Sequence, residues 1–111
     1  LFADYREQQT PFALVMIEID NLSLVSAEFG LATGDDVTIK VAAIIRQSVR
    51  PGDHVARFGG ERFVAVLPAA PFDAAMEAAE RMRSLVEAPD AGAVHPIVTT
   101  VSIGVAQSKA F

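Results

Sequence analysis

The chain of 111 residues contains no cysteine, no long apolar run and no cluster of lysine and arginine. Without cysteine it can form neither disulfides nor thiolate metal sites. No apolar run reaches the roughly 18 residues that a membrane-spanning helix needs. The formal net charge of −5, without a basic cluster, argues against binding along a nucleic-acid backbone. We therefore expect neither nucleic acid nor a membrane among the partners of this segment. A small phosphate ligand stays compatible, because it needs only a few local donors or a metal ion.

The chain does contain enough apolar material for the core of one domain, since 51% of its residues are hydrophobic. Short apolar runs rich in branched side chains predict strands, and apolar residues at helical spacing predict helices. The predicted strands are 12–19, 54–58, 63–67 and 97–106. The predicted helices are 22–29, a second that opens at 33 and is ended by 51–52, a third that starts at 71–73 and an N-terminal one over 1–9; residues 88–96 are predicted to form a loop.

The order of these elements predicts the fold class. One hairpin lies between helical crossovers, which indicates an α+β fold. We expect a ferredoxin-like sandwich with a mostly antiparallel central sheet and helices packed against it. Gly30 has the place of a residue that ends a helix, and Thr33 and Asp36 have the spacing of a capping box at the start of the next one. We expect a single domain over 1–111.

Two acidic residues are candidates for a metal site. Glu18 lies near the end of the first strand, and Glu61 follows the two glycines of the hairpin. If the first strand pairs beside the hairpin, the two carboxylates converge and repel each other unless a cation lies between them. Oxygen ligands favour Mg²⁺ or Mn²⁺, and Gly59 and Gly60 let a phosphate approach the backbone. The residues alone leave a second interpretation open, a common Gly-Gly turn followed by surface acids.

A second candidate site lies between the second helix and the hairpin. Arg50 and Asp53 flank a Pro-Gly turn, and a guanidinium can clamp a phosphate or a guanine edge through two parallel hydrogen bonds. The alternative is a helix end where the dipole favours a basic residue and the aspartate is solvated. Asp35 is open to two interpretations as well: a carboxylate stabilised by the helix dipole, or a group that recognises a purine.

Three stretches together strongly resemble the GGDEF family of diguanylate cyclases, over about residues 12–106. They are IEIDNLSLVSAEFGLATGDD (17–36), RPGDHVARFGGERF (50–63) and VTTVSIGVA (98–106). In order, they correspond to the family's D-x-D-x-F-K-x-x-N-D-x-x-G-x-x-x-G-D segment, its R-x-x-D before R-[YF]-G-G-[DE]-E-F, and its closing T-x-S-x-G-V-A strand. Three such pieces in the correct order and spacing make the resemblance specific, and it implies a nucleotide-cyclase-like fold.

The resemblance also implies a chemistry and a role for particular residues. Active members condense two GTP molecules to cyclic di-GMP and pyrophosphate, with Mg²⁺ held by acids. The roles expected from the family are listed here: metal ligands Glu18, Ile19 (through its carbonyl) and Glu61, with Glu61 also catalytic; GTP-binding positions Ser26, Asp35, Gly59 and Gly60; and a cyclic di-GMP inhibitory site at Arg50 and Asp53.

Four positions depart from the family's pattern. The first metal acid is Glu18 instead of aspartate, and Mg²⁺ tolerates poor geometry badly. Ser23 replaces a lysine, and Ser26 replaces an asparagine whose amide offers both a donor and an acceptor. Arg62 replaces the last glutamate of the signature, so a positive charge stands where a negative one is expected. Its guanidinium either pairs with Glu61 in the place of the metal or contacts phosphate directly, but it cannot coordinate a cation.

Our main hypothesis is therefore a cytoplasmic, degenerate GGDEF domain of cyclic di-GMP signalling, impaired in catalysis, that binds cyclic di-GMP or GTP through its R-x-x-D site. One alternative is an active diguanylate cyclase, and another is a dimerisation module that binds no nucleotide. The expected partners are cyclic di-GMP or GTP, a second copy of the chain and other domains of a longer regulatory protein. The family's opening and closing segments are not found in the chain, which is why we expect a longer protein.

Overall fold

The computed structural model describes residues 11–88 and 98–108. The predicted N-terminal helix over 1–9 and nearly all of the predicted loop over 88–96 lie outside these ranges. The elements in chain order are β1 (Phe12–Ile19), α2 (Leu22–Phe29), α3 (Leu31–Gln47), β2 (His54–Phe58), β3 (Arg62–Pro68), α4 (Phe72–Glu87) and β4 (Val101–Gln107). In the described part of the chain, no helix is long and apolar enough to cross a membrane.

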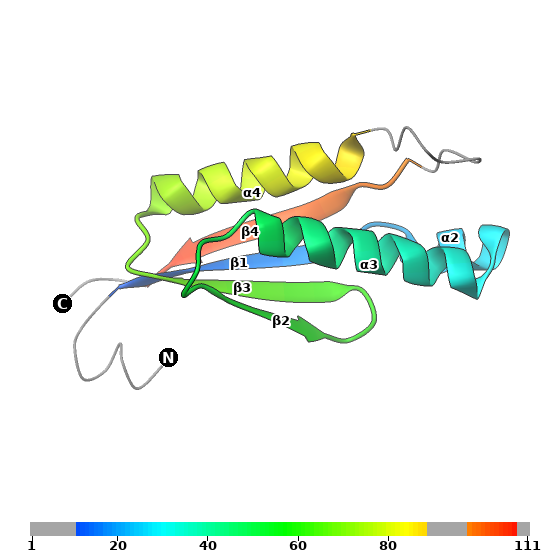
Figure 1. Ribbon diagram of the computed structural model, residues 1–111, viewed down its shortest axis with the longest axis horizontal. Coiled ribbons are helices and arrows are strands. Elements are labelled where there is room, and N and C mark those ends of the chain that lie inside the picture. Colours follow the sequence, from blue (N-terminus) through cyan, green and yellow to red (C-terminus); the bar gives the residue numbers. More distant parts are fainter. Residues whose placement is uncertain (1–10, 89–97, 109–111) are drawn as a thin grey trace.

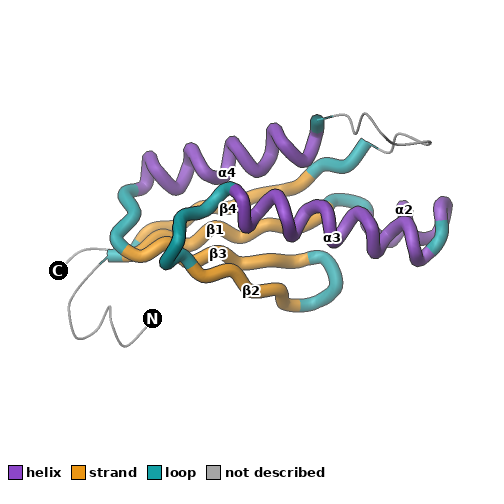
Figure 2. The backbone as a smooth tube through the Cα atoms, in the orientation of Figure 1, coloured by secondary structure: helices purple, strands orange, loops and turns teal. Residues whose placement is uncertain are grey.

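The four strands form one sheet in the order β2-β3-β1-β4, and every neighbouring pair is antiparallel (Figures 1 and 2). β1 lies in the interior of the sheet between β3 and β4, so it touches both the hairpin and the last strand. The predicted α+β fold with an antiparallel central sheet is confirmed. This order also places the C-terminal end of β1 beside the turn of the β2–β3 hairpin.

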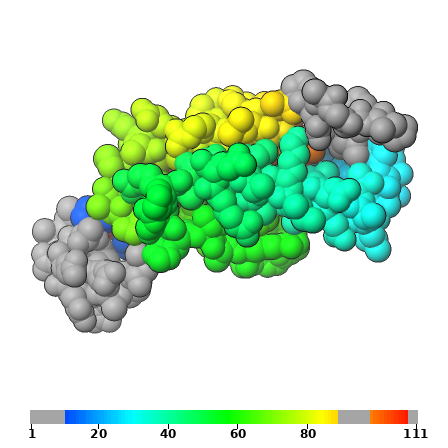
Figure 3. Space-filling model, viewed as in Figure 1, coloured from blue at the N-terminus to red at the C-terminus, as the bar shows by residue number. Residues whose placement is uncertain are grey.

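The core lies between the sheet and the helices. Along β1 every second residue is buried, from Ala13 to Ile19, because successive side chains of a strand point to opposite faces. α3 and α4 cover this buried face and lie side by side along the molecule (Figure 3). Their buried apolar residues follow the predicted helical stripes: Val37, Val41, Ile44 and Ile45 on α3, and Ala75, Ala79, Met82 and Val86 on α4. Each large apolar side chain buried here contributes about 1.5–3 kcal/mol to folding.

The start of α3 differs from the prediction. The helix begins at Leu31 and not at Thr33. Gly30, with a φ of 99°, is both the last capping residue of α2 and the residue directly before α3. Thr33 caps nothing: its hydroxyl donates to the carbonyl of Phe29, one turn back, at 3.0 Å. The predicted capping box is wrong, because a positive φ at Gly30 lets the chain turn into α3 two residues earlier.

The last strand also begins later than predicted. β4 starts at Val101, which is the partner of Ile19 at the end of β1. The residues before Val101 have no strand opposite them in the described sheet. Instead, the carbonyl of Thr100 accepts a hydrogen bond from the backbone N–H of Asp20 at 3.0 Å. The sequence pattern was strand-like here, but the length of β1 determines where β4 can pair.

Candidate functional site

The β2–β3 hairpin carries the glycine-rich signature and is closed by a turn over residues 59–61. Gly59 has a φ of 71°, a conformation that suits glycine. The Nη2 of Arg57 donates to the carbonyl of Gly60 at 2.6 Å, and its guanidinium lies 6.0 Å from the ring centre of Phe63. The predicted hairpin is confirmed. A Cβ added at either Gly59 or Gly60 would meet no atom within 4 Å, so the backbone of this turn is open to an approaching group.

The hairpin turn and the end of β1 lie against each other. The backbone N–H of Ile19 donates to the carbonyl of Glu61 at 2.9 Å. Glu18 stands directly opposite Arg62 in the β1–β3 register. The two signature segments, 44 residues apart in the chain, are therefore joined at one end of the sheet.

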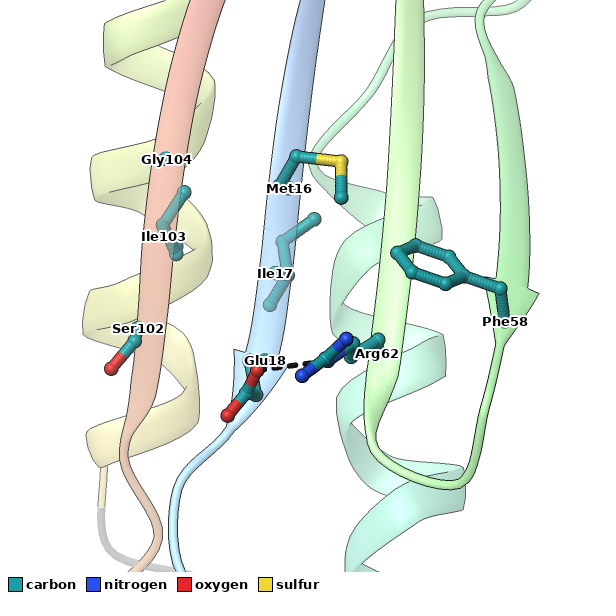
Figure 4. Close-up of a pocket in the computed structure, with 8 residues that line it drawn as sticks. All are labelled: Met16, Ile17, Glu18, Phe58, Arg62, Ser102, Ile103 and Gly104. Atoms are coloured by element: carbon teal, nitrogen blue, oxygen red, sulfur yellow. Dashed lines mark hydrogen bonds and ion pairs between the residues drawn. The ribbon is translucent and has the colours of Figure 1, made fainter.

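Arg62 forms an ion pair with Glu18 and not with Glu61. Its Nε donates to Oε2 of Glu18 at 3.0 Å (Figure 4). The side chains are 55% and 46% exposed, so water reaches both of them. Sequence reasoning considered Glu61 as the partner of Arg62, with a direct contact to phosphate as the alternative. Residues directly opposite across two strands are closer on one face than consecutive residues, which point to opposite faces.

Asp20, two residues after Glu18, ties the end of β1 to the start of β4. Its Oδ2 accepts from the hydroxyl of Thr100 at 2.7 Å and its Oδ1 accepts from the hydroxyl of Ser102 at 2.6 Å. Both carboxylate oxygens are thereby engaged by protein groups. Sequence reasoning assigned no role to this residue. The signal that could have found it is the pair of hydroxyls spaced two apart in the closing strand, which lies beside β1.

The residues expected to bind guanine lie on the helical corner formed by α2 and α3. Ser26 is half-buried on α2, and its carbonyl accepts from the N–H of Gly30 at 2.9 Å. Gly34 of α3 is buried against it: a Cβ added at Gly34 would lie 2.1 Å from the hydroxyl oxygen of Ser26. Asp35, the next residue, is exposed. The two helices thus approach so closely that only glycine fits at position 34 while Ser26 keeps this rotamer.

Arg50 and Asp53 form a closed pair on the turn before β2. Oδ2 of Asp53 accepts from the backbone N–H of Arg50 at 2.8 Å and from its Nε at 3.4 Å, while Nη2 of Arg50 lies 3.3 Å from Oδ1. The same Nη2 donates to the carbonyl of Pro68 at 3.0 Å. The side chain of Arg50 is 58% exposed and that of Asp53 only 2%. The arginine is thus held in place and presented to solvent, beside a hollow of about 440 Å³ that it lines together with Arg46 and Val55.

The fold and these motifs agree with comparisons to known proteins. The family profile described as "Diguanylate cyclase, GGDEF domain" matches residues 1–110. The chain belongs to the GGDEF family.

Named relatives of this GGDEF domain support the same assignment. It is 36% identical over 93 residues to diguanylate cyclase DgcP of Pseudomonas aeruginosa, covering 83% of this chain and 14% of that protein. It is 34% identical over 99 residues to diguanylate cyclase DosC of Escherichia coli K12, covering 87% of this chain and 22% of that protein. The chain therefore spans less than a quarter of the length of these two relatives.

A solved GGDEF domain confirms the architecture. The crystal structure of the GGDEF domain of DgcB from Caulobacter crescentus, in complex with c-di-GMP, superposes with a TM-score of 0.88 at 28% sequence identity. The match covers 97% of this chain and 66% of that one. The four-stranded sheet and the helices on its buried face are thus those of the family.

Diguanylate cyclases of this family generally use Mg²⁺, and at the signature end of this domain protein groups engage several of the acidic oxygens. One oxygen of Glu18 is engaged by Arg62, and both oxygens of Asp20 accept from hydroxyls. Among the described residues, no group of three or more His, Cys, Asp or Glu side chains is arranged to hold a metal. Mg²⁺ requires near-ideal oxygen geometry, and a guanidinium is not a ligand.

Proposed function

We propose that this domain acts as a cyclic di-GMP-binding module of second-messenger signalling, in the cytoplasm, and that its own cyclase activity is impaired. The observation that carries the proposal is the contrast between the domain's two nucleotide-related sites. Arg50 is fixed, exposed and beside a hollow. At the signature end of the sheet, by contrast, Arg62 has replaced an acid and pairs with Glu18.

The geometry of Arg50 supports recognition of an anionic or guanine-containing ligand. Asp53 and the carbonyl of Pro68 hold its guanidinium, so little side-chain entropy is lost when a ligand binds. A hollow of about 440 Å³ lies within the range of small-ligand pockets. The solved DgcB domain was crystallised with c-di-GMP, which supports the same ligand class here. Asp53 positions Arg50; for its carboxylate to accept from guanine N–H groups as well, the turn would have to open, because this side chain is nearly inaccessible.

Titration of the full-length protein with cyclic di-GMP by calorimetry tests the proposal. Arg50→Ala should weaken binding about 10- to 100-fold, because hydrogen bonds to charged groups contribute roughly 1.5–3 kcal/mol. Arg83→Ala is a matched control, since within residues 11–88 and 98–108 Arg83 pairs only with Glu80 and Glu87 on α4, and it does not line the hollow. No heat with the wild type, or equal affinity for wild type and Arg50→Ala, would contradict the proposal.

A second candidate function is diguanylate cyclase activity, because the curated relatives carry that name. Incubation of the full-length protein with GTP and Mg²⁺ or Mn²⁺ tests it. We expect little or no cyclic di-GMP. Product that disappears in Glu61→Ala would show that the domain is an active enzyme and that our proposal of impairment is wrong. No thermal shift with either GTP or cyclic di-GMP would favour a protein–protein module instead.

A further inference from the structure

Four side chains form a row across the end of the sheet. In the strand registers, Phe58 of β2 faces Arg62 of β3, Arg62 faces Glu18 of β1, and Glu18 faces Ser102 of β4. Figure 4 shows these residues around one pocket, with α3 and α4 behind the sheet. Residues directly opposite each other in antiparallel strands have Cβ atoms about 4.5–5.5 Å apart. The Glu18–Arg62 ion pair is therefore a consequence of strand register.

We propose that the guanidinium of Arg62 acts as a tethered cation in the place of a divalent ion, so that the signature end of this domain takes up neither Mg²⁺ nor Mn²⁺. The inference uses the same family correspondence as the proposed function, but it concerns a different site. The exclusion of the divalent ion is attributed to one residue, Arg62, which lies opposite Glu18 in the sheet.

The charges at this end of the sheet support the exchange of one cation for another. Glu18 has a positive partner at 3.0 Å, which satisfies the carboxylate without a metal. A divalent ion at Oε2 of Glu18 would have to displace that partner, and an ion at the other oxygen would be repelled by it. Asp20 cannot compensate, because its two oxygens are directed to Thr100 and Ser102. Glu61 remains as the one nearby acid whose side chain has no hydrogen bond or ion pair within the described residues, and one carboxylate is a poor divalent site without substrate phosphates.

The same geometry predicts how the site can be converted. In Arg62→Glu, two carboxylates face each other across β1 and β3 and repel, as like charges directly opposite do. The backbone N–H of Ile19, next to Glu18 in the chain, donates to the carbonyl of Glu61, which keeps the hairpin turn against the end of β1. A cation between the carboxylates would remove the repulsion. The variant should therefore gain a divalent site that the wild type lacks.

Mn²⁺ alone, titrated into the full-length protein and followed by the loss of the free-ion signal in electron paramagnetic resonance, tests the proposal. At 100 μM protein and Mn²⁺, we expect no uptake that depends on Glu18 in the wild type and about one equivalent bound in Arg62→Glu. Adding Glu18→Gln to that variant should abolish the uptake. Arg62→Gln, which removes the positive charge without adding a negative one, is the second variant in case Arg62→Glu does not fold. Its Mn²⁺ affinity should lie between those of the wild type and Arg62→Glu.

Two results would overturn the inference. The first is one equivalent of Mn²⁺ bound to the wild type and lost in Glu18→Gln, because the ion would then coexist with Arg62. The second is absence of Mn²⁺ uptake in every folded Arg62 variant, because Arg62 would then not be what excludes the metal. Cyclic di-GMP affinity, measured on the same variants, should stay within threefold of the wild type. Mn²⁺ uptake therefore tests the role of Arg62, and cyclic di-GMP affinity separately tests the proposed function of Arg50.

Discussion

The close approach of α2 and α3 at Gly34 leads to a prediction about stability that can be worked out from distances. A Cβ at Gly34 would lie 2.1 Å from Oγ of Ser26 and 3.3 Å from its Cβ. The first distance is far below any van der Waals contact, and the second is tight but tolerable. Gly34→Ala must therefore move Ser26 or push the helices apart. This corner matters for function because it carries both positions expected to meet guanine, Ser26 and Asp35.

Two opposing terms set the size of the effect. Forcing an extra methyl group into a packed site costs about 1–3 kcal/mol. Alanine in place of glycine inside a helix recovers about 1 kcal/mol. We expect Gly34→Ala to lower the free energy of unfolding by roughly 0–2 kcal/mol in the wild-type background. In a Ser26→Ala background the worst contact is gone, so the same change should be neutral or should stabilise by up to about 1 kcal/mol.

A double-mutant cycle measured by urea denaturation separates these terms. The four proteins are the wild type, Gly34→Ala, Ser26→Ala and the double variant, and the expected interaction energy is about 1–3 kcal/mol in favour of the double variant. Gly60→Ala is the matched control, because a Cβ there would meet nothing within 4 Å and should not couple to Ser26. An interaction energy below about 0.5 kcal/mol would refute the reasoning, since it would mean that Ser26 is not what restricts position 34.

Two further predictions concern the pair of hydrogen bonds that Asp20 accepts from Thr100 and Ser102, here called the Asp20 clamp, and an ion pair on α4. Asp20→Ala should lower the free energy of unfolding by about 1–3 kcal/mol in urea denaturation, because the hydroxyls of Thr100 and Ser102 lose a charged acceptor; an unchanged denaturation midpoint would contradict the clamp. The hydrogen bond from Arg83 lowers the pKa of Glu80, so this pair stabilises the fold at pH values above the carboxyl's unfolded pKa and loses that contribution as the pH falls through the lower folded pKa. Carboxyl NMR titration should show the pKa of Glu80 rising in Arg83→Gln, and an unchanged pKa would rule out Arg83 as the cause.

Much of the fold was predictable because it depends on local patterns. The alternation along β1, the helical stripes of α3 and α4, and the Gly59–Gly60 turn all follow from the spacing of residues in the chain. The prediction was least accurate at the ends of elements. α3 starts at Leu31 because of the backbone conformation of Gly30, and β4 starts where β1 ends, which no local pattern in the last strand encodes.

In the candidate site, too, the sequence identified residues that belong to local motifs and missed contacts between distant segments. Sequence reasoning found Glu18, Glu61 and Arg62 from the signature, and it expected the first strand and the hairpin to meet. It left open the partner of Arg62. It also missed Asp20, whose partners Thr100 and Ser102 lie 80 and 82 residues away. Contacts at such separations depend on which strands are neighbours and in which register, so they could be considered but not chosen from the sequence.

By itself the sequence determined the α+β class, the signature hairpin and the GGDEF resemblance, because each of these is carried by residue types at fixed spacing. Only the tertiary structure decided that Arg62 neutralises Glu18, that Asp53 is enclosed beneath Arg50, and that Ser26 meets Gly34. The physical reason is that a strand alternates its faces and a register aligns distant residues. On a strand, the partner of a charged side chain can therefore lie across the sheet, as Arg62 does for Glu18.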